Sequence, residues 1–258
     1  MDFDGKIALV TGAGSGIGAA TVRALVFRGA KAVYACDIDE AAARRVVAEL
    51  GSATPLGMDV ACADQVSAAF DTVLAAHGRI DVVVHAAGVD DPGSKQRMYE
   101  AAEQNRPPEV LAHLDDTAWR RIMSVNLDGT FYVLRAAVRA MRETGGAIVT
   151  VGSSSAFDTL TGYPHYAASK AGVHALSQAV AKEVAPFGIR VNTVAPGPVD
   201  TAMAARTPPH LRAAMIANGF RGYAMPEELA DNILYLASPG AANVVGAVLL
   251  SNGGRFTV

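Results

Sequence analysis

Short apolar segments alternate with longer amphipathic segments along nearly the whole of this 258-residue chain. The short segments are four to seven residues long, rich in Val, Ile, Leu or Ala, and apolar almost throughout. Strands of this kind are typical of a parallel sheet that helices cover on both faces. The expected strands are residues 6–10, 31–36, 55–58, 80–85, 147–151, 190–194 and 244–250.

The longer segments have the length and pattern of helices, and each separates two expected strands. Regular alternation of strand and helix predicts βαβ units with right-handed crossovers, and therefore an α/β fold with a doubly wound parallel sheet. We expect one domain over residues 1–258, because a chain of this length with 51% hydrophobic residues can bury a large single core. The expected helices are residues 17–28, 40–50, 63–77, 117–144, 166–187 and 227–237.

One segment, residues 89–116, breaks this alternation. It has prolines at positions 92, 107 and 108 and a dense mixture of both charges. We expect an elaborated surface segment there, with one short helix. A lid over the substrate is expected at about residues 201–225.

Composition limits the classes of partner. A formal net charge of -3 and a pI near 6.1, with the 22 Lys and Arg residues scattered, provide no basic surface for nucleic acid or an anionic membrane. No apolar run reaches the ~18–20 residues of a membrane span and the first residues form no apolar signal core, so we expect a cytoplasmic protein with a small-molecule partner. Cys36 and Cys62 lack metal-ligand spacing and are expected to be buried free thiols; no metal site is expected.

The stretch TGAGSGIG, residues 11–18, places four glycines directly after the first expected strand and at the start of a helix. At such a position Gly12, Gly16 and Gly18 would let a dinucleotide pyrophosphate approach bare backbone N–H groups and the positive end of the helix dipole. The spacing G-x-x-x-G-x-G is weak evidence by itself, and an ordinary glycine-rich turn is the alternative. The strand before it and the helix after it favour nucleotide binding.

Tyr166 and Lys170 are four residues apart in an expected helix, so their side chains project from one face. A free tyrosine has a pKa of ~10. An ammonium group about 4 Å away, at an effective dielectric constant of ~20, would favour the phenolate by ~4 kcal/mol, or roughly three pKa units before desolvation. We therefore expect Lys170 to lower the pKa of Tyr166 so that it can act as a base. An exposed pair on a helix is the alternative, and Tyr163 is not the base because Ala167 lies four residues after it.

Four motifs occur in order along the chain: TGAGSGIG at 11–18, HAAG at 85–88, YAASK at 166–170 and PGPVDT at 196–201. Together they resemble the motifs of the short-chain dehydrogenases/reductases, and the resemblance covers nearly the whole chain. It implies a Rossmann-type sheet with helices on both faces, an oxidoreductase activity with a nicotinamide cofactor, and a homotetramer. His85 departs from the family's usual asparagine, which changes one local hydrogen bond of that motif.

The run GSSSAF, residues 152–157, follows an expected strand at its carboxyl end, where ligands of open α/β sheets bind. On this ground Ser153, Ser154 and Ser155 compete for the role of holding the substrate oxygen. The resemblance implies Ser153, because the family's substrate-orienting serine lies thirteen residues before its tyrosine.

Asn126 lies within the expected helix 117–144, where an asparagine side chain competes for backbone hydrogen bonds and can disturb the helix. A surface asparagine is the alternative. The resemblance makes Asn126 the fourth member of a catalytic set with Ser153, Tyr166 and Lys170, in which it holds a water molecule against Lys170.

Cofactor choice is expected to depend on Asp37, which follows Gly18 by nineteen residues at the end of the second expected strand. An acid at this offset accepts hydrogen bonds from the adenosine ribose and repels a 2′-phosphate, and Asp39 and Glu40 add to the repulsion, so we expect NAD. Asp59 and Val60 would flank the adenine. The alternative is that Asp59 is an ordinary turn aspartate. The expected cofactor contacts are Gly12, Ser15, Gly16, Ile17, Gly18, Asp37, Asp59, Val60, Ala87, Gly88, Tyr166, Lys170, Pro196, Gly197, Val199 and Thr201.

These observations predict an NAD-dependent oxidoreductase that interconverts an alcohol and a carbonyl compound. The alternative is a non-catalytic NAD-binding scaffold or a redox-sensing regulator of the same fold. Lys95, Arg97 and Arg106 could meet an acidic substrate or form a solvated face. The residues expected to line the substrate pocket are Ser155, Phe157, Tyr163, His165, Met203 and Arg206, of which His165 is expected to pack or bond locally.

Overall fold

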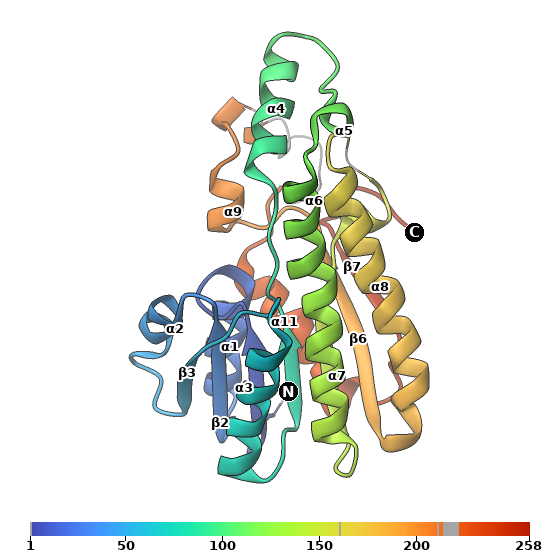
Figure 1. The fold of residues 1–258 in the computed structure, drawn as a ribbon. Coiled ribbons are helices and arrows are strands. Elements are labelled where there is room, and N and C mark those ends of the chain that lie inside the picture. Colours follow the sequence, from blue (N-terminus) through green and yellow to red (C-terminus); the bar gives the residue numbers. More distant parts are fainter. Residues whose placement is uncertain (1, 160, 211, 214–221) are drawn as a thin grey trace.

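Seven parallel strands form one sheet in the order β3-β2-β1-β4-β5-β6-β7 in the computed structural model of the protein (Figure 1). The structure describes residues 2–159, 161–210, 212–213 and 222–258. All seven expected strands and the doubly wound parallel sheet are confirmed. The strands are β1 (Ile7–Thr11), β2 (Ala32–Asp37), β3 (Ala53–Gly57), β4 (Val82–His85), β5 (Gly146–Val151), β6 (Ile189–Pro196) and β7 (Val248–Ser251).

The strand order reverses between β1 and β4. Thr11, the last residue of β1, pairs with Cys36 of β2 on one side and with His85 of β4 on the other. Chain connections leave β1 and β4 in opposite directions along the sheet, so a cleft opens at their carboxyl ends. This is the place where doubly wound sheets bind their ligands.

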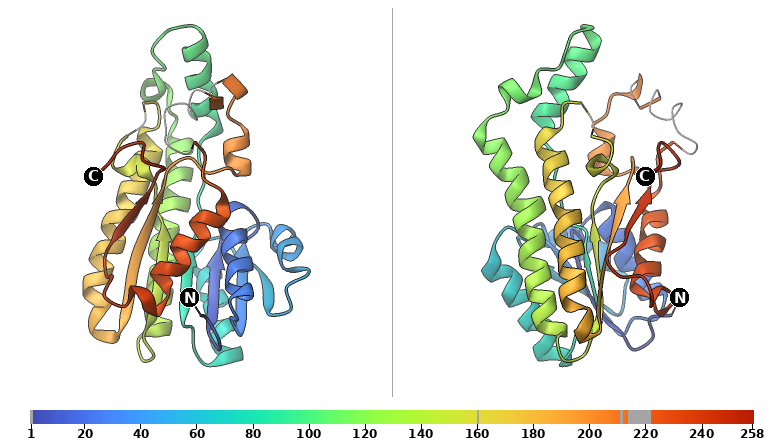
Figure 2. Two further views of the ribbon diagram at one scale, coloured as in Figure 1. Left: turned by 180° about the vertical axis from the view of Figure 1, so that it is seen from behind. Right: turned by 90° about the vertical axis from the view of Figure 1, so that its right-hand side faces the viewer.

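Helices cover both faces of the sheet, and each face has its own apolar core (Figure 2). Alternate residues of β1 serve the two cores: Ala8 and Val10 face one, and Ile7 and Leu9 face the other. The first core is closed by α1 (Gly16–Phe27), α2 (Glu40–Val47) and α11 (Pro226–Ala237), and the second by α3 (Ala63–His77), α7 (Gly129–Met141) and α8 (Pro164–Val184).

The long helix expected at residues 117–144 is divided into three parts. It begins as α6 (Asp116–Met123), passes through a π-helical turn at Ser124–Asp128 and continues as α7. The turn contains Asn126, the position at which the sequence predicts a disturbance of the helix. At the other expected long helix, α8 is followed by a 3-10 turn at Ala185–Phe187.

Residues 89–116 are more helical than their composition predicts. They form α4 (Pro92–Glu103) and α5 (Val110–His113), so the expectation of one short helix is wrong. The start of α4 is well defined, because Pro92 occupies the first turn and the Asp91 carboxylate accepts hydrogen bonds from the backbone N–H groups of Gly93 and Ser94.

The two helices of this segment lie above the carboxyl ends of the strands, and α4 lies there beside α9 (Ala202–Ala205) (Figures 1 and 2). Of the lid expected at 201–225, residues 211 and 214–221 lie outside the described part of the chain. Short 3-10 turns at Ser154–Ala156 and Pro239–Ala241 complete the elements.

Two expectations from composition concern cysteines and membranes. Both cysteines are free; Cys36 is buried, but Cys62 is only half-buried because it precedes α3 at the surface. None of the helices in the described residues is long and apolar enough to cross a membrane.

The tight packing of the glycine loop generates a stability prediction. A methyl group at Gly18 would lie 2.1 Å from the carbonyl oxygen of Gly12, whereas one at Gly51 would meet nothing within 4 Å. We expect Gly18→Ala to lower the free energy of unfolding by about 1–3 kcal/mol, as overpacking does. Gly51→Ala should change it by less than about 1 kcal/mol. Urea denaturation of both variants measures the difference, and equal stabilities would contradict the close packing of the loop.

Candidate active site and cofactor cleft

The glycine loop connects β1 to α1 and is pressed against the end of β4. Gly12 and Gly16 have φ values of 65° and 51°, which favour glycine. A methyl group at Gly12 would lie 2.8 Å from Cα of Ala87. Ser15 precedes α1 with its side chain exposed, and Ile17 is half-buried in the first turn. The loop therefore presents backbone rather than side chains at the amino end of α1, as a pyrophosphate site requires.

Asp37 is the last residue of β2, and its carboxylate binds the backbone of the glycine loop. Its carboxylate accepts a hydrogen bond of 2.8 Å from the Gly14 N–H group and one of 2.9 Å from the Asp39 N–H group. The first contact was not foreseen from the sequence. It makes Asp37 a structural partner of the glycine loop as well as a candidate ribose ligand.

The two arginines nearest to Asp37 are engaged on α2. Arg44 pairs with Glu40, and Arg45 lies 3.8 Å from the Asp39 carboxylate. Both pairs are on the exposed surface of the helix. Neither guanidinium pairs with Asp37, whose hydrogen-bond donors among the described residues are backbone N–H groups.

Asp59 and Val60 follow β3 in a turn, since the strand ends at Gly57. The Asp59 carboxylate accepts a hydrogen bond of 2.9 Å from the Ala61 N–H group, as a turn aspartate does. Val60 is buried, and a methyl group on Gly129 of α7 would lie 3.0 Å from it. These contacts support the interpretation of Asp59 as a turn aspartate. The expected contact of Asp59 and Val60 with the adenine stays a prediction.

The loop after β6 crosses to the glycine loop. β6 ends at Pro196, Gly197 follows it, and Val199 is buried. A methyl group at Gly16 would lie 3.1 Å from Cγ2 of Thr201. The PGPVDT loop therefore forms the wall of the cleft opposite the end of β4.

Tyr166 and Lys170 lie one turn apart on α8. Lys170 is 5% exposed, and its ammonium group donates a hydrogen bond of 2.9 Å to the carbonyl oxygen of Val151. Nζ of Lys170 lies 6.0 Å from the centre of the Tyr166 ring. Burial lowers the pKa of Lys170 to about 8.

The expected lowering of the Tyr166 pKa is not found. Burial raises this pKa above its ordinary value, a hydrogen bond with Ser153 acts in the opposite sense, and the charge of Asp90 raises it further. The Lys170 ammonium group donates to the Val151 carbonyl and is not among the groups that shift the Tyr166 pKa, so desolvation of the phenolate dominates.

Ser153 caps the 3-10 turn after β5. Its Oγ accepts a hydrogen bond of 3.1 Å from the Ser155 N–H group and lies 2.8 Å from Ser155 Oγ. Both serines are buried. Of the three candidate serines, Ser153 is the one that interacts with Tyr166, and Ser155 supports it.

Asn126 fixes the segment that follows β4. Its side-chain oxygen accepts a hydrogen bond of 2.9 Å from the Val89 N–H group, and its amide donates to the Val89 carbonyl at 3.0 Å and to Ser169 Oγ at 3.1 Å. A methyl group on Gly88 would lie 3.3 Å from Nζ of Lys170 and 3.4 Å from Oδ1 of Asn126. The end of β4 therefore brings Asn126 and Lys170 to the same point.

His174 was missed by the sequence analysis. It lies one turn after Lys170 on α8, and its Nε2 accepts a hydrogen bond of 3.3 Å from the Ser153 N–H group. Burial and the charge of Lys170 lower the pKa of His174 to about 4, so the ring is neutral and can accept. The four-residue spacing from Lys170 is the signal that could have found it.

His85 takes the place of the family's asparagine between the two central strands. Its Nδ1 shares a hydrogen bond of 2.8 Å with the hydroxyl of Thr11, which also accepts the Ala87 N–H group at 3.1 Å. Burial, with a smaller contribution from Lys170, lowers the pKa of His85 to about 3. His85 therefore links the end of β4 to the end of β1.

The expected substrate residues lie around the entrance of the site. Phe157 is 39% exposed, with its ring centre 5.1 Å from that of His174. Tyr163 is buried, and its ring meets that of Tyr166 edge-on at 6.0 Å. The Met203 carbonyl accepts a hydrogen bond from Lys95, and His165 is buried with Nε2 3.4 Å from the Asp91 carboxylate.

A groove of about 870 Å³ lies apart from these residues. It runs between α5 and the first half of α8, and none of Asn126, Ser153, Tyr166 and Lys170 lines it. The lining residues are Pro108, Glu109, Val110, Leu111, Ala112, Ala156, Thr159, Thr161, Gly162, Pro164, Ala167, Ala168 and Ala171.

A family model described as short chain dehydrogenase matches residues 6–212. The chain belongs to the short-chain dehydrogenase family. This short-chain dehydrogenase is 40% identical to the cis-4-hydroxycyclohexanecarboxylate dehydrogenase of Sinomonas cyclohexanicum, with 99% of this chain and 98% of the relative covered. It is 39% identical to the galactitol 2-dehydrogenase (L-tagatose-forming) of Cereibacter sphaeroides, with 99% and 96% covered.

Solved structures agree with this assignment. A short-chain type dehydrogenase/reductase from Mycobacterium ulcerans superposes with a TM-score of 0.87 at 30% sequence identity, over 99% of this chain and 91% of that one. The family binds a nicotinamide cofactor. The resemblance drawn from the four motifs is thereby confirmed, and the relatives are oxidoreductases.

The buried ammonium of Lys170 generates a prediction about pH and stability. An unfolded lysine keeps its proton up to ~10.4, whereas the folded one releases it near pH 8. Between these values the unfolded chain binds more protons, so this residue should make the free energy of unfolding rise with pH. Replacing the lysine in Lys170→Met should reduce that rise by up to about 3 kcal/mol. Urea denaturation from pH 7.5 to 10.5 tests this, and identical profiles for both proteins would refute it.

Proposed function

We propose that the protein is an NAD-dependent dehydrogenase that interconverts a secondary alcohol and its ketone. The observation that carries the proposal is the close approach at Gly88, where the end of β4 meets Lys170 and Asn126 beside the glycine loop. This contact brings candidate proton-transfer residues to the edge of a cleft suited to a dinucleotide. The two named relatives support it, because their names describe dehydrogenation of compounds with secondary hydroxyl groups.

The roles of the residues follow from their contacts. The bound nicotinamide would accept a hydride from the alcohol carbon in oxidation and return it in reduction. Ser153 would orient the substrate oxygen, and Tyr166 would exchange a proton with that oxygen. Lys170 would bind the cofactor ribose and hold positive charge near the phenol, and Asn126 would complete a proton path to solvent.

The direction of the Tyr166 pKa shift bears on the direction of reaction. A raised pKa keeps the phenol protonated near neutral pH. A protonated phenol can donate to a ketone oxygen but cannot accept a proton from an alcohol. We therefore expect reduction near neutral pH and oxidation that increases toward alkaline pH.

The residues proposed to bind NAD line the two walls of the cleft. Asp37 would accept hydrogen bonds from the adenosine ribose. Arg44 and Arg45 pair with acids on α2 and in its cap, so they would not bind a 2′-phosphate. The other proposed contacts are Gly12, Ser15, Gly16, Ile17, Gly18, Asp59, Val60, Ala87, Gly88, Tyr166, Lys170, Pro196, Gly197, Val199 and Thr201.

Assembly and location are part of the same proposal. We infer a homotetramer, because Trp119 on α6 and Phe131 on α7 are 41% and 43% exposed and such rings are commonly covered by another subunit. We also infer a cytoplasmic enzyme. The competing function is a scaffold or regulator that binds NAD without turnover.

The first test is Tyr166→Phe. This change removes the proton-exchanging hydroxyl and little binding surface, so turnover should fall at least 100-fold while NAD affinity changes less than about threefold. Nicotinamide absorbance with a panel of secondary alcohols and ketones measures turnover, and tryptophan fluorescence titration measures affinity. Undiminished turnover in the variant would refute the role of Tyr166. Tight NAD binding by the wild type without turnover of any compound would favour the regulator.

The second test concerns cofactor choice and uses Asp37→Asn. The amide keeps one acceptor for the glycine loop but loses the charge that would repel a 2′-phosphate of about -1.5 to -2. NAD binding should weaken by roughly 1.5–3 kcal/mol, the value of hydrogen bonds to a charged group, while NADP use holds steady or improves.

Asp39→Asn is the matched control for this test. It removes a carboxylate two residues away that caps α2. Because Asp39 adds only to the general repulsion of a 2′-phosphate, its NAD to NADP ratio of kcat/KM should change much less than that of Asp37→Asn. A wild type that uses both cofactors equally, or an Asp37→Asn ratio equal to that of the control, would place the discrimination elsewhere.

A further inference from the structure

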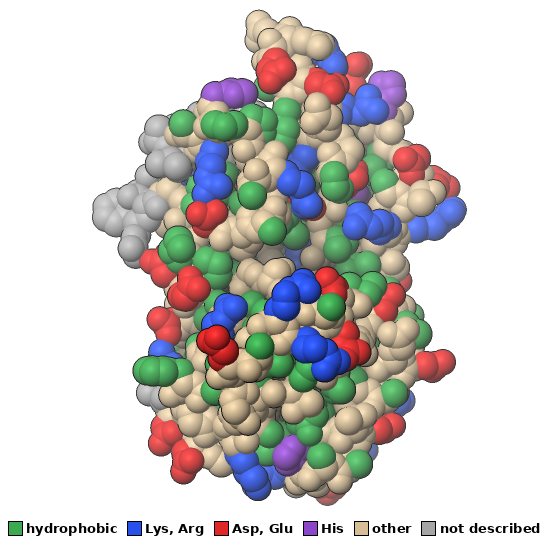
Figure 3. Space-filling view, turned by 90° about the vertical axis from the view of Figure 1, so that its left-hand side faces the viewer, with side chains coloured by type: hydrophobic (Ala, Val, Ile, Leu, Met, Phe, Trp, Pro, Cys, Tyr) green, Lys and Arg blue, Asp and Glu red, His purple; other side chains and the backbone are tan. Residues whose placement is uncertain are grey.

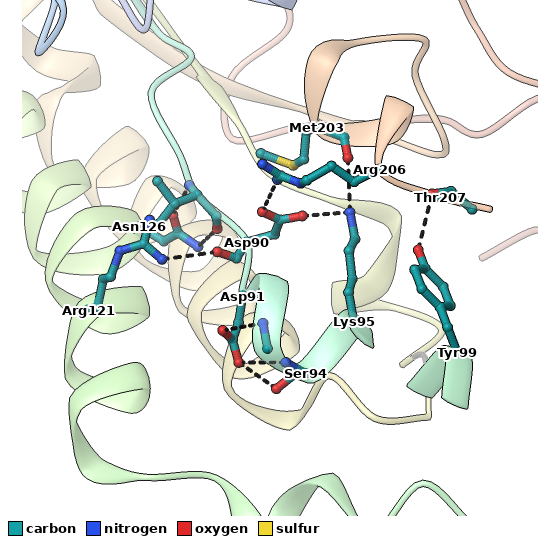
Figure 4. Close-up of polar contacts among 12 residues, drawn as sticks. Asp90, Asp91, Ser94, Lys95, Tyr99, Arg121, Asn126, Met203, Arg206 and Thr207 are labelled. Carbon is teal, nitrogen blue, oxygen red and sulfur yellow. Dashed lines mark hydrogen bonds and ion pairs between the residues drawn. The ribbon is translucent and has the colours of Figure 1, made fainter. Parts of the chain in front are cut away.

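Three charged side chains above the carboxyl ends of the strands form the Asp90 cluster: Asp90, Lys95 and Arg206 (Figure 4). Asp90 follows Val89, which Asn126 holds, and its side chain is 6% exposed. Lys95 Nζ lies 2.6 Å from one carboxylate oxygen, and a guanidinium nitrogen of Arg206 lies 2.5 Å from the other. The cluster joins the segment held by Asn126 to α4 and to the residues after α9.

The Asp90 cluster has more positive than negative charge. One carboxylate faces two cations, and Arg121 donates a hydrogen bond of 3.3 Å to the Asp90 carbonyl oxygen. The neighbouring Asp91 carboxylate is directed instead to the first turn of α4, where it accepts from Ser94. The Lys95 side chain is 16% exposed and that of Arg206 is 48% exposed, so a ligand from solvent can reach the guanidinium side of the cluster. An anion at the cluster would balance the excess positive charge.

A buried hydroxyl lies between this cluster and the site. Tyr163 is 7% exposed, and within the described part of the chain its hydroxyl has no hydrogen-bond partner. Its ring contacts Tyr166. Burial and the charge of Asp90 raise the pKa of Tyr163, so the hydroxyl keeps its proton and can donate. A buried donor without a partner is costly unless a ligand supplies an acceptor.

Most N–H donors of the Arg206 guanidinium have no hydrogen-bond partner among the described residues. Among the described residues its one hydrogen-bond partner is Asp90, which uses one of the five N–H groups of a guanidinium. Its side chain is 48% exposed. Figure 3 shows the surface hollowed between the part with α4 and α9 and the part with α1 to α3, with Lys and Arg side chains on both sides. Arg206 directly follows α9 and therefore belongs to the first of these two parts.

We propose that the substrate is a hydroxy acid or oxo acid whose carboxylate binds Arg206 and Tyr163 beside the Asp90 cluster, while its reacting carbon lies at Tyr166. This inference rests on the proposed dehydrogenase function and adds the chemical class of its substrate. Asp90 holds the guanidinium in place, and the carboxylate of the substrate supplies the missing acceptor.

A purely structural role of the cluster is the competing explanation. Lys95 also donates to the Met203 carbonyl at 3.1 Å, and Tyr99 donates to Thr207 at 3.2 Å, so these contacts link α4 to α9 and the residues directly after it (Figure 4). A structural tie would affect every substrate alike. A carboxylate site would affect only those that carry the charge.

The experiment compares straight-chain secondary hydroxy acids, with the hydroxyl on the third, fourth or fifth carbon, with their methyl esters. For at least one chain length, wild-type kcat/KM should be at least tenfold higher for the acid than for its ester. Arg206→Gln should lower this acid to ester ratio at least tenfold, mainly through KM. Tyr163→Phe should lower it about threefold or more, and it removes a hydroxyl that no described residue bonds. A general loosening of the contacts between α4 and residues 203–207 would lower kcat/KM for the acid and the ester alike, so it would not change this ratio.

Arg106→Gln is the matched control, because Arg106 is an exposed arginine between α4 and α5 whose contacts are local, with Gln104 and Pro107. Its ratio should equal that of the wild type. A wild-type ratio near one, or equal losses for acid and ester in Arg206→Gln and Tyr163→Phe, would overturn the carboxylate site and leave the dehydrogenase function standing. No turnover of any acid or ester with either nicotinamide cofactor would instead overturn the proposed function.

Discussion

The buried ammonium group of Lys170 organises the chemistry at the carboxyl ends of the central strands. It is held by one carbonyl oxygen, that of Val151, and lies against the backbone at Gly88. Together with burial, its charge keeps His85 and His174 neutral, because a second positive charge nearby would be unfavourable. A neutral His174 can accept the Ser153 N–H group. Burial is the main cause of the neutrality of both histidines, and the Lys170 charge adds to it on both β4 and α8.

The parts of the fold that depend on local chemistry could be predicted from the sequence. A continuous apolar run between two helices has few alternatives to a buried parallel strand, so all seven strands were found. A disturbance of the long helix at Asn126 was also expected, although its side chain bonds to Val89 and Ser169 rather than to the backbone of its own helix. The offset of Asp37 from the glycines placed it correctly at the end of β2.

Features that depend on distant partners could not be predicted. The polar helix α4 has little apolar pattern of its own, and its contacts with Met203 and Thr207 come from a segment more than 100 residues away. The Tyr166 pKa depends on how deeply the phenol is buried, which helical spacing does not reveal. His174 was missed for a similar reason, since its role appears only when α8 packs against the turn after β5.

The double use of the Asp37 carboxylate couples two properties that are usually considered separately. The same two oxygen atoms are proposed to bind the adenosine ribose, and they hold the amide groups of Gly14 and Asp39. A substitution that adapts this position to a different nicotinamide cofactor also removes an anchor of the loop that must receive the pyrophosphate. Only a residue such as asparagine, which loses the charge but keeps an oxygen acceptor, could change the cofactor without releasing Gly14. Under selection, any other replacement would have to arise with a second substitution that restores this acceptor, or in a background that tolerates a weakened loop.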